Sequence, residues 1–312
     1  MQLQQNEFAP LKQSLQRSEA PQSARQCTTI GRTMRVHHLD CCSMCPLSAR
    51  LLNGHGPMFG RGRMVAHCLL IETDAHGLVL VDTGIGLADI ADPAKTLGKS
   101  FTVATGLSRP SVAMSAFEQV KALGHDPRDV RHILPTHLDL DHAGGLADFP
   151  RAKVHIHTAE RAAALAPPTF AESNRYRPAH FAHNPDWALY AQTGEPWKGF
   201  PAVRSLIGLP PEILAIPLPG HTRGHACIAV DTGAGWLLHA GDAYFSRGTI
   251  DGSGAPIGMT LFEKVVAIDG KRVRENHARL GELLRTHPND LRVFCAHDPE
   301  EFDALRAASR AH

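Results

Sequence analysis

The 312-residue sequence predicts an α/β fold in which two sheets pack between outer helices, a four-layer αββα sandwich. Strand-like pairs occur in both halves of the chain, and each pair is followed by strand–helix alternation. Several of the apolar runs are almost continuous, which is typical of strands that are covered on both faces. Together these observations favour two covered sheets over an open one.

The first half is predicted to contain five strands, at residues 35–39, 67–73, 78–82, 129–134 and 153–157. Residues 74–77 read as the turn of a hairpin between the second and third strands. Ser111 is expected to cap a helix that runs to about Leu123, and Thr158 to cap an alanine-rich helix. Two further stretches, residues 41–64 and 85–108, are predicted to be loops.

The second half is predicted to contain strands at residues 213–218, 226–230, 236–239 and 291–295, and an amphipathic helix at 271–285. Residues 166–212 differ, because Pro, Trp, Tyr and Phe are frequent there and no period persists. Long irregular segments of compact domains often wall a pocket, so this Pro/aromatic-rich insertion either lines the substrate site, through Trp187 and Trp197 among others, or packs on itself.

Residues 1–33 are rich in Gln and Ser and lack an apolar pattern, which predicts a disordered tail before a single domain at residues 34–312. The tail has no apolar core of a secretory signal, so a cytoplasmic location is expected. No apolar run approaches the roughly 20 residues that span a bilayer. A net charge of +1 gives no case for nucleic acid or a membrane surface. The expected partner is a small-molecule substrate, and a homodimer is left open.

The seven cysteines argue against a disulfide framework, because their number is odd and no export signal precedes them. Cys42 and Cys45 form an isolated C-x-x-C pair. A structural zinc site needs two further ligands nearby, and none is evident in the sequence. Buried or loop thiols are therefore favoured over a metal or redox site.

The most informative stretch is residues 136–145, Thr-His-Leu-Asp-Leu-Asp-His-Ala-Gly-Gly. It follows a predicted strand and holds four side chains of metal-binding type, His137, Asp139, Asp141 and His142. Pro135 ends the strand, so these side chains fan out from a loop at the strand's C-terminal end, where α/β proteins commonly place ligands.

This stretch resembles the H-x-H-x-D-H motif of the metallo-β-lactamase superfamily, with Asp139 in place of the second histidine. Further short motifs follow the family order: Val81–Gly84, Gly220–His225, Gly241–Asp242 and Ala296–Asp298. Five motifs in order across most of the chain form a specific signal. The resemblance implies the αββα fold, and the duplication of its two halves rests on the resemblance, because no close internal sequence repeat is present.

The resemblance also implies two divalent metal ions. Metal 1 would be held by His137, Asp139 and His221, metal 2 by Asp141, His142 and His297, and Asp242 would bridge both. Imidazole and carboxylate ligands suit zinc, with manganese and iron as alternatives. Such a pair of ions can hold a bridging hydroxide as the nucleophile.

Asp139 is the main departure from the family motif. A carboxylate can replace imidazole as a ligand, and we favour this swap over loss of the metal-1 site. The added negative charge would shift the metal preference toward manganese or iron and raise the pH optimum. If the site were lost instead, the chain would keep one metal ion or be a degenerate enzyme, and a non-catalytic metal-binding protein is the alternative of another class.

Three neighbours of the ligands have expected roles. Asp82 is predicted to hydrogen-bond a ligand histidine and so fix the tautomer of that ring. His225 is predicted to hydrogen-bond the backbone. Tyr244 lies two residues after Asp242, whereas the N-acyl homoserine lactonases of this superfamily have a tyrosine three residues after that aspartate, a position that Phe245 occupies here. Tyr244 is therefore expected to be an electrophilic helper, and Asp242 is the expected proton acceptor.

Within the superfamily the motifs are most similar to those of N-acyl homoserine lactonases, because His297–Glu300 matches their H-D-x-E ending. A lactonase is therefore the expected function. A phosphotriesterase or another ester hydrolase of the same fold is the alternative.

Overall fold

The computed structural model describes residues 34–107, 110–191, 194, 196–200 and 204–310, all within one unit, Arg32–His312. The predicted tail at residues 1–33 lies outside the described residues. No helix among the described residues is long and apolar enough to cross a membrane. The six cysteines of this part are free thiols, and all but Cys45 are buried. Cys27 is not among the described residues.

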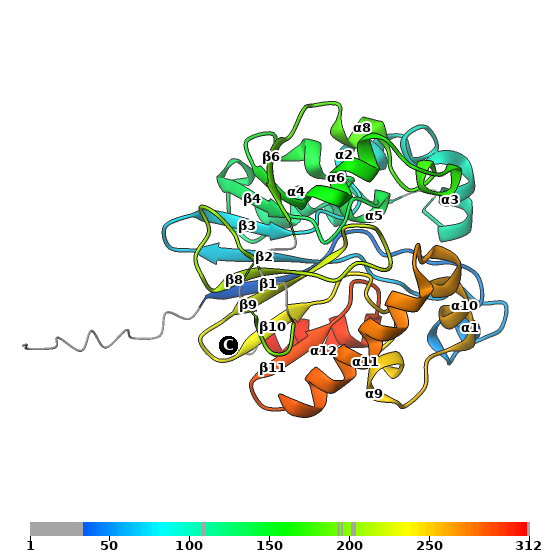
Figure 1. The fold of residues 1–312 in the computed structure, drawn as a ribbon. Helices are drawn as coiled ribbons and strands as arrows, with labels where there is room; N and C mark the ends of the chain where they lie inside the picture. Colours follow the sequence, from blue (N-terminus) through cyan, green and yellow to red (C-terminus); the bar gives the residue numbers. More distant parts are fainter. Residues whose placement is uncertain (1–33, 108–109, 192–193, 195, 201–203, 311–312) are drawn as a thin grey trace, which may run out of the picture. The chain divides into compact units, whose positions relative to one another are not determined.

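Two sheets form the centre of the fold (Figure 1). The first has the order β1 (Arg35–Asp40), β2 (His67–Thr73), β3 (Gly77–Val81), β4 (Val130–Leu134), β5 (Lys153–His157), β6 (Asp186–Tyr190). The second has the order β11 (Leu291–Phe294), β10 (Trp236–His239), β9 (Ala226–Asp231), β8 (Ile213–Pro217), β7 (Arg204–Ser205). Strands β3 to β6 are parallel neighbours, as are β10 and β11, and the remaining neighbours are antiparallel.

The sheets pack face to face because their strands alternate. Leu69 and Ile71 of β2 belong to one buried cluster with Ile228 and Phe294 of the second sheet. Leu70, between them, points to the opposite face of the first sheet. There it joins a second cluster that contains helical residues. Strands β2 and β3 are thus covered on both faces, as their apolar runs predicted.

Helices cover both outer faces and complete the four layers. The first-sheet cluster includes Val120 of α4 (Ala116–Ala122) and Ala163 of α6 (Thr158–Leu165). The outer cluster of the second sheet includes Leu280 and Leu283 of α11 (Gly270–Thr286). Figure 1 shows α4 and α6 beside the first sheet and α11 beside the second. The predicted αββα sandwich is confirmed.

The remaining helices lie mostly between strands. They are α1 (Ala49–Asn53), α2 (Leu87–Ala91), η1 (Ala94–Gly98), α3 (Lys99–Thr105), η2 (Val112–Met114), η3 (Pro127–Asp129), α5 (Leu140–Ala143), η4 (Leu146–Asp148), α7 (Phe170–Ser173), α8 (Pro178–Phe181), α9 (Gly248–Asp251), α10 (Ile257–Val266) and α12 (Pro299–Arg310). Several of them correct the sequence prediction. Within the predicted loop, the described residues 85–107 are largely helical. The prediction missed these helices because segments of five to seven residues are too short to show a helical period.

Two predicted helix caps are displaced. Ser115, not Ser111, caps α4, and its hydroxyl accepts a hydrogen bond from the Glu118 N–H at 3.2 Å. The pair Ser115 and Glu118 has the S-x-x-E spacing of a strong helix start. At α6 the cap is His157, whose Nδ1 accepts from the Ala159 N–H at 3.1 Å. Thr158 is the first residue inside that helix.

The aromatic segment at residues 166–212 is partly ordered into strands and helices, and its tryptophans pack into the cores. Trp187 lies in β6 against the first-sheet cluster, with its ring 6.0 Å from that of Phe181. Trp197 packs against the second-sheet cluster, 5.0 Å from the ring of Trp236. The prediction that these two side chains wall the substrate pocket is therefore wrong, and plain packing explains them.

Replacing Trp187 with alanine should destabilise the protein without changing substrate affinity. Because the ring is partly buried against the core, we expect a loss of roughly 2–3 kcal/mol in the free energy of unfolding, below the 3–5 kcal/mol typical of a fully buried tryptophan. Urea denaturation and KM on the folded variant would measure both effects. A raised KM with unchanged stability would return Trp187 to the substrate pocket.

Candidate metal centre

The candidate site residues all follow the C-terminal ends of strands or lie in loops beside them. Asp82 follows β3, and His137 to His142 follow β4, its parallel neighbour. Asp242 and His297 follow the parallel strands β10 and β11. His221 lies in the loop between β8 and β9. Parallel neighbours end at the same edge of a sheet, so two edges from two sheets supply the whole constellation.

The first group consists of His137, His221 and Asp242, which are buried and whose ligand-type atoms lie within 4.8 Å of one another. Oδ2 of Asp242 is 3.3 Å from His221 Nε2 and 3.8 Å from His137 Nε2. Ligands at about 2.0–2.1 Å around a tetrahedral ion are separated by about 3.3 Å. The spacing of these ligand-type atoms therefore suits a divalent ion.

The second group consists of Asp141, His142 and His297. Nε2 of His142 and Nε2 of His297 are 3.3 Å apart, and Asp242 Oδ1 lies 3.3 and 3.2 Å from them. Asp141 is looser, with carboxylate oxygens 4.0 Å from His142 and 3.7 Å from His297. The Asp242 carboxylate thus faces one group with each of its oxygens.

The electrostatics of the second group favour a cation. Burial would lower the pKa of His142, but Asp242, Asp82 and Asp141 outweigh it and raise that pKa well above its usual value. His297 behaves likewise, because Asp242 and Asp141 outweigh its burial and raise its pKa. Burial would raise the pKa of Asp242, but His297, His142 and His221 hold it well below its ordinary value. A site that draws protons onto imidazoles also attracts a metal ion.

The histidine rings are held so that Nε2 points into the site. Nδ1 of His142 donates to Asp82 Oδ2 at 2.9 Å, and Nδ1 of His297 donates to the Val65 carbonyl at 2.7 Å. Both rings therefore present a free Nε2 lone pair in their neutral form. Nε2 of His137 is buried and has no hydrogen-bond partner among the described residues. A metal ion would give this nitrogen a partner, so the residues present fit the ion that the motif implies.

Asp82 has the role that the sequence predicted. Besides binding His142, its Oδ1 accepts from the Thr136 N–H at 2.7 Å, which ties the ends of β3 and β4 together. The backbone of Asp82 has φ of 56°, a left-handed conformation that is uncommon for residues other than glycine. Such strain persists where surrounding contacts fix it, as the contacts of this carboxylate do here. His225 bonds backbone as expected, through the Leu218 carbonyl and the Asp242 N–H.

The family model of the metallo-beta-lactamase superfamily matches residues 61–297. The chain belongs to the metallo-beta-lactamase superfamily. It is 41% identical, over 88% of its length and 84% of the relative, to a probable metallo-hydrolase of Mycobacterium tuberculosis. An N-acyl homoserine lactonase of a Bacillus species is 25% identical over 75% of this chain and 81% of its own length.

Solved structures show the same fold at lower identity. The Bacillus thuringiensis protein AiiA, with N-decanoyl-L-homoserine at its active site, has a TM-score of 0.65 at 19% identity and covers 88% of this chain and 96% of its own. AidC, a dizinc quorum-quenching lactonase, has a TM-score of 0.56 at 16% identity, over 86% and 88% of the two chains. The protein is thus a metallo-hydrolase of the metallo-beta-lactamase superfamily.

Asp139 departs from the family motif, and the structure pairs it with Arg175, a residue that no sequence pattern singles out. Arg175 Nε donates to Asp139 Oδ1 at 2.9 Å, and Arg175 Nη2 donates to Asp139 Oδ2 at 2.5 Å. The same Nη2 lies 2.7 Å from His221 Nε2, and Nη1 donates to the Val266 carbonyl. Arg175 belongs to the aromatic segment, between α7 and α8. That segment therefore reaches the site through a cation and not through its tryptophans.

Asp139 still lies close to the first group. Its Oδ2 is 3.4 Å from His137 Nε2 and 3.2 Å from His221 Nε2. Burial would raise its pKa, but Arg175 and His137 outweigh burial and hold the pKa well below its usual value. The carboxylate is thus charged and neutralised by Arg175. Arg175 thus compensates the added negative charge from which a raised pH optimum was expected, and the pH optimum of this metallo-beta-lactamase site stays a prediction.

Glu160 of α6 is a second residue that the sequence did not single out. Its Oε1 accepts from the Leu138 N–H at 3.0 Å, and its Oε2 accepts from the Gly224 N–H at 2.9 Å. One fully buried carboxylate thus joins the His137 loop to the His221 loop. Gly224 fits only without a side chain, because a Cβ there would lie 2.4 Å from the Glu160 nitrogen. A single Glu in an alanine-rich helix gives no signal of this role.

Glu160→Gln should weaken metal binding as well as stability, because the amide keeps one acceptor oxygen for two loop N–H groups. We expect a loss of about 1–3 kcal/mol in unfolding free energy and a measurable fall in zinc affinity. Glu172→Gln is the matched control, because Glu172 pairs with Arg223 on the same side and touches neither loop N–H. Lower stability with unchanged zinc affinity would limit Glu160 to a purely structural role.

Tyr244 is placed away from the two groups. Its hydroxyl donates to the Glu301 carboxylate, 2.9 and 3.0 Å from the two oxygens, and its ring is part of the outer cluster of the second sheet. Burial raises the pKa of Glu301 to about 7. Phe245 is the neighbour that faces the site, with its ring stacked on His297 at 5.4 Å. The expected role of Tyr244 as an electrophilic helper is therefore wrong.

Tyr244→Phe should leave turnover within about twofold of wild type. The variant removes a buried hydroxyl and leaves Glu301 with one partner fewer, so we expect a destabilisation of about 1–3 kcal/mol. Initial rates at saturating metal, with thermal unfolding in parallel, would measure both quantities. A loss of turnover by 100-fold at unchanged stability would restore the catalytic assignment.

A cavity of about 590 Å³ opens beside Phe245. Its lining includes the apolar side chains of Leu52, Met259 and Phe245 and the polar side chains of Arg247, Asp298 and Glu300. Asp298 directly follows His297, so the cavity adjoins the second group. It is large enough for a small-molecule substrate.

Proposed function

We propose that the protein is a dinuclear metal-dependent lactonase that acts on lactones with an acyl chain, of the N-acyl homoserine lactone type. The observation that carries the hydrolase part is the Asp242 carboxylate, whose two oxygens face two separate groups of imidazoles at 3.2–3.8 Å. The lactone part is supported by the 25% identity to a Bacillus lactonase over 75% of this chain. The lining of the neighbouring cavity, which contains both polar and apolar side chains, suits a lactone head and an acyl tail.

His137, His221 and Asp242, with Asp139 beside them, would hold one ion, and Asp141, His142, His297 and Asp242 the other. Nitrogen and carboxylate ligands suit zinc, and also manganese or iron. When bound, such a pair of ions supplies a nucleophilic water at neutral pH and polarises the substrate carbonyl. No serine or cysteine nucleophile is required for this chemistry.

The protein's own side chains orient the reaction. Asp242, within the site, is the carboxylate placed to accept the proton that the attacking water gives up. Arg175 supplies the cation that this chain has in place of a tyrosine at position 245. Its guanidinium is fixed by Asp139 and Val266, and we expect the Nη2 group that now contacts His221 to donate to the carbonyl oxygen of the lactone once an ion occupies that nitrogen.

A substrate panel on the zinc-loaded enzyme tests this function. We expect N-acyl homoserine lactones to be opened with a kcat/KM at least 100-fold above that for phosphotriesters and simple aryl esters. Preferential cleavage of phosphotriesters would replace the lactonase by the phosphotriesterase alternative and leave the metallo-hydrolase unchanged. A metal-replete protein with no turnover on any of the three classes would favour the non-catalytic alternative.

A further inference from the structure

A second cluster of metal-binding side chains lies at the other end of the first sheet. His37 of β1, Glu72 of β2 and His125, which follows α4, have ligand-type atoms that all lie within 4.8 Å of one another. These residues are 35 and 53 positions apart in the sequence, so the fold alone brings them together. We propose that they form a further binding site for a divalent transition-metal ion, separate from the candidate centre.

The strand register places the first two ligands on the same face. His37 is paired with Leu70 across β1 and β2, and Leu70 and Glu72 are two residues apart on one strand. Leu70 faces the helix side of the first sheet, together with Val120 of α4. His125 leaves the end of the same helix, so all three side chains meet on the helix side. The convergence follows from the strand pairing and the packing of α4.

The distances suit an ion with few ligands. Glu72 Oε1 lies 2.6 Å from His37 Nε2 and 3.5 Å from His125 Nε2. The two rings are inclined by 66° with their centres 6.2 Å apart, so they do not stack. Tetrahedral zinc separates its ligand atoms by about 3.3 Å, so of the two Glu72 distances the second already fits and the first must widen by less than about 1 Å. A rotation of the Glu72 side chain can supply this change.

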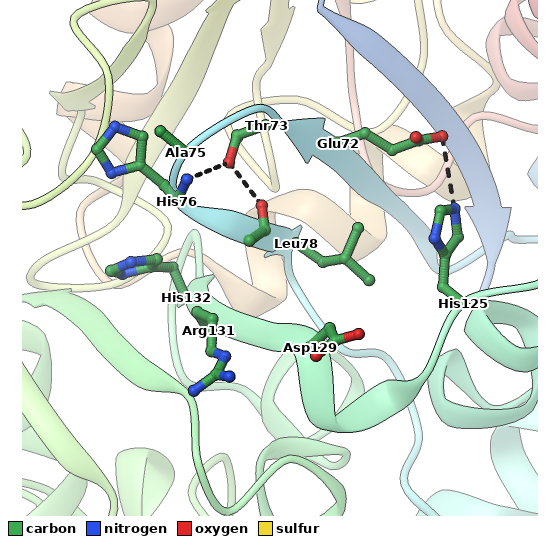
Figure 2. Close-up of a pocket in the computed structure, with 10 residues that line it drawn as sticks. Glu72, Thr73, Ala75, His76, Leu78, His125, Asp129, Arg131 and His132 are labelled. Atoms are coloured by element: carbon green, nitrogen blue, oxygen red, sulfur yellow. Dashed lines mark hydrogen bonds and ion pairs between the residues drawn. The ribbon is translucent and has the colours of Figure 1, made fainter.

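The surroundings leave room for entry and for further ligands. The side chains of His37, Glu72 and His125 are 22%, 29% and 27% exposed, so they are partly desolvated yet reachable. Glu72 and His125 border an open pocket of about 670 Å³, and Figure 2 shows them pointing toward each other at one side of it. Figure 2 also shows His76 and His132 on the opposite side of the pocket. Solvent or a small ligand in the pocket can complete the coordination.

The composition of the cluster selects the kind of ion. Two imidazoles and one carboxylate suit zinc, nickel, copper or ferrous iron, whereas magnesium and calcium prefer oxygen ligands alone. Arg35 is the competing cation, with Nη1 3.7 Å from Glu72 Oε1, but its side chain is 73% exposed. A pair that is so open to solvent contributes little, so an ion can displace it at low cost.

The site is independent of the candidate centre. Glu72 is paired with Leu78 near the start of β3, whereas Asp82 follows the end of that strand. Four residues of a strand span about 13 Å, so an ion at Glu72 shares no ligand with the centre. Its effect would be structural, because it would tie β1 and β2 to the segment that follows α4. Binding to the folded state alone raises the melting temperature.

Zinc binding to the full-length protein tests the proposal. Equilibrium dialysis should give wild type one zinc per chain more than His125→Asn or His37→Asn. His76→Asn is the matched control, because His76 lines the same pocket but is not one of the three ligands. Excess zinc should raise the melting temperature of wild type and of the control by several degrees more than that of either ligand variant.

Glu72→Gln separates a ligand from a structural residue. The amide oxygen can still accept the hydrogen bond of His37, so this variant should fold but lose the additional zinc. Equal zinc content and equal zinc-dependent stabilisation in wild type, Glu72→Gln and His125→Asn would overturn the site and leave a hydrogen-bonded surface cluster. Lactone turnover should be retained by all these variants, so the outcome does not depend on the proposed function.

Discussion

Asp242→Asn is expected to reduce lactone turnover by roughly 10³-fold or more, with loss of tightly bound metal. Each Asp242 oxygen faces one of the two groups, and an amide offers one neutral oxygen and an N–H₂ that repels a cation. A metal ion contributes several kcal/mol to transition-state stabilisation, and each 1.36 kcal/mol is tenfold in rate. Metal content by elemental analysis and turnover on one N-acyl homoserine lactone would measure the two effects.

Two controls keep this result specific. Asp141→Asn should have a smaller effect on metal content, because its oxygens lie 3.7–4.0 Å from the imidazole nitrogens, farther than the Asp242 Oδ1. Asp126→Asn, at a surface residue that pairs with Arg128, should change neither quantity beyond about twofold. A folded Asp242→Asn protein that keeps two metal ions and more than a tenth of the turnover would refute the bridging role of Asp242.

Arg175→Met is expected to tighten metal binding at the first group while it lowers turnover. Arg175 Nη2 hydrogen-bonds Nε2 of His221, the atom that an ion would need, and its charge repels that ion. Removing the guanidinium frees Nε2 of His221 and leaves Asp139 as an unpaired carboxylate. Two charges about 4 Å apart interact by roughly 4 kcal/mol at an effective dielectric of 20, so even partial relief exceeds tenfold in affinity.

The two members of this ion pair should have opposite effects. Asp139→Ala leaves the guanidinium without its carboxylate beside His221, so zinc affinity should fall, whereas in Arg175→Met it should rise. Turnover should fall in both, by about 100-fold in Arg175→Met if the guanidinium donates to the carbonyl oxygen. The double variant Asp139→His, Arg175→Leu restores the family motif and should bind zinc better than Asp139→Ala.

Chelator competition at fixed pH would measure these affinities independently of turnover. Weaker zinc binding in Arg175→Met than in wild type would contradict the competition for His221. If Arg175→Met binds zinc more tightly but keeps a kcat within about twofold of wild type, Arg175 competes with the ion for His221 but does not donate to the carbonyl oxygen of the lactone.

The sequence predicted what depends on local pattern. The strands were recognisable from their length and apolar character, and the ligand-type residues from their spacing after strand ends. Tyr244 shows the limit of this approach, because a shift of one position along the chain directs a side chain to Glu301 and not to the site. Phe245, one residue later, is the one that contacts His297.

Arg175 and Glu160 could not have been predicted, because their partners are distant in sequence. Arg175 is 36 residues from Asp139, and Glu160 is 64 residues from Gly224. No period or motif marks such a contact before the chain is folded. The short helices of residues 85–108 were missed for a different reason, since a segment of one or two turns carries too few apolar positions to define a face.

The ligands come from both halves of the chain, and this orders the steps by which the protein matures. Asp141 and His142 follow a strand of the first sheet, whereas Asp242 and His297 follow strands of the second. His297 is further anchored to Val65, 232 residues earlier. If these residues hold the metal ions as proposed, neither half alone can assemble either site, and we expect high-affinity metal uptake to follow the docking of the two sheets. The rate of metal binding during refolding should therefore report the rate of the last assembly step. Removal of the metal by a chelator should make the two halves separate more readily under mechanical force or during proteolysis.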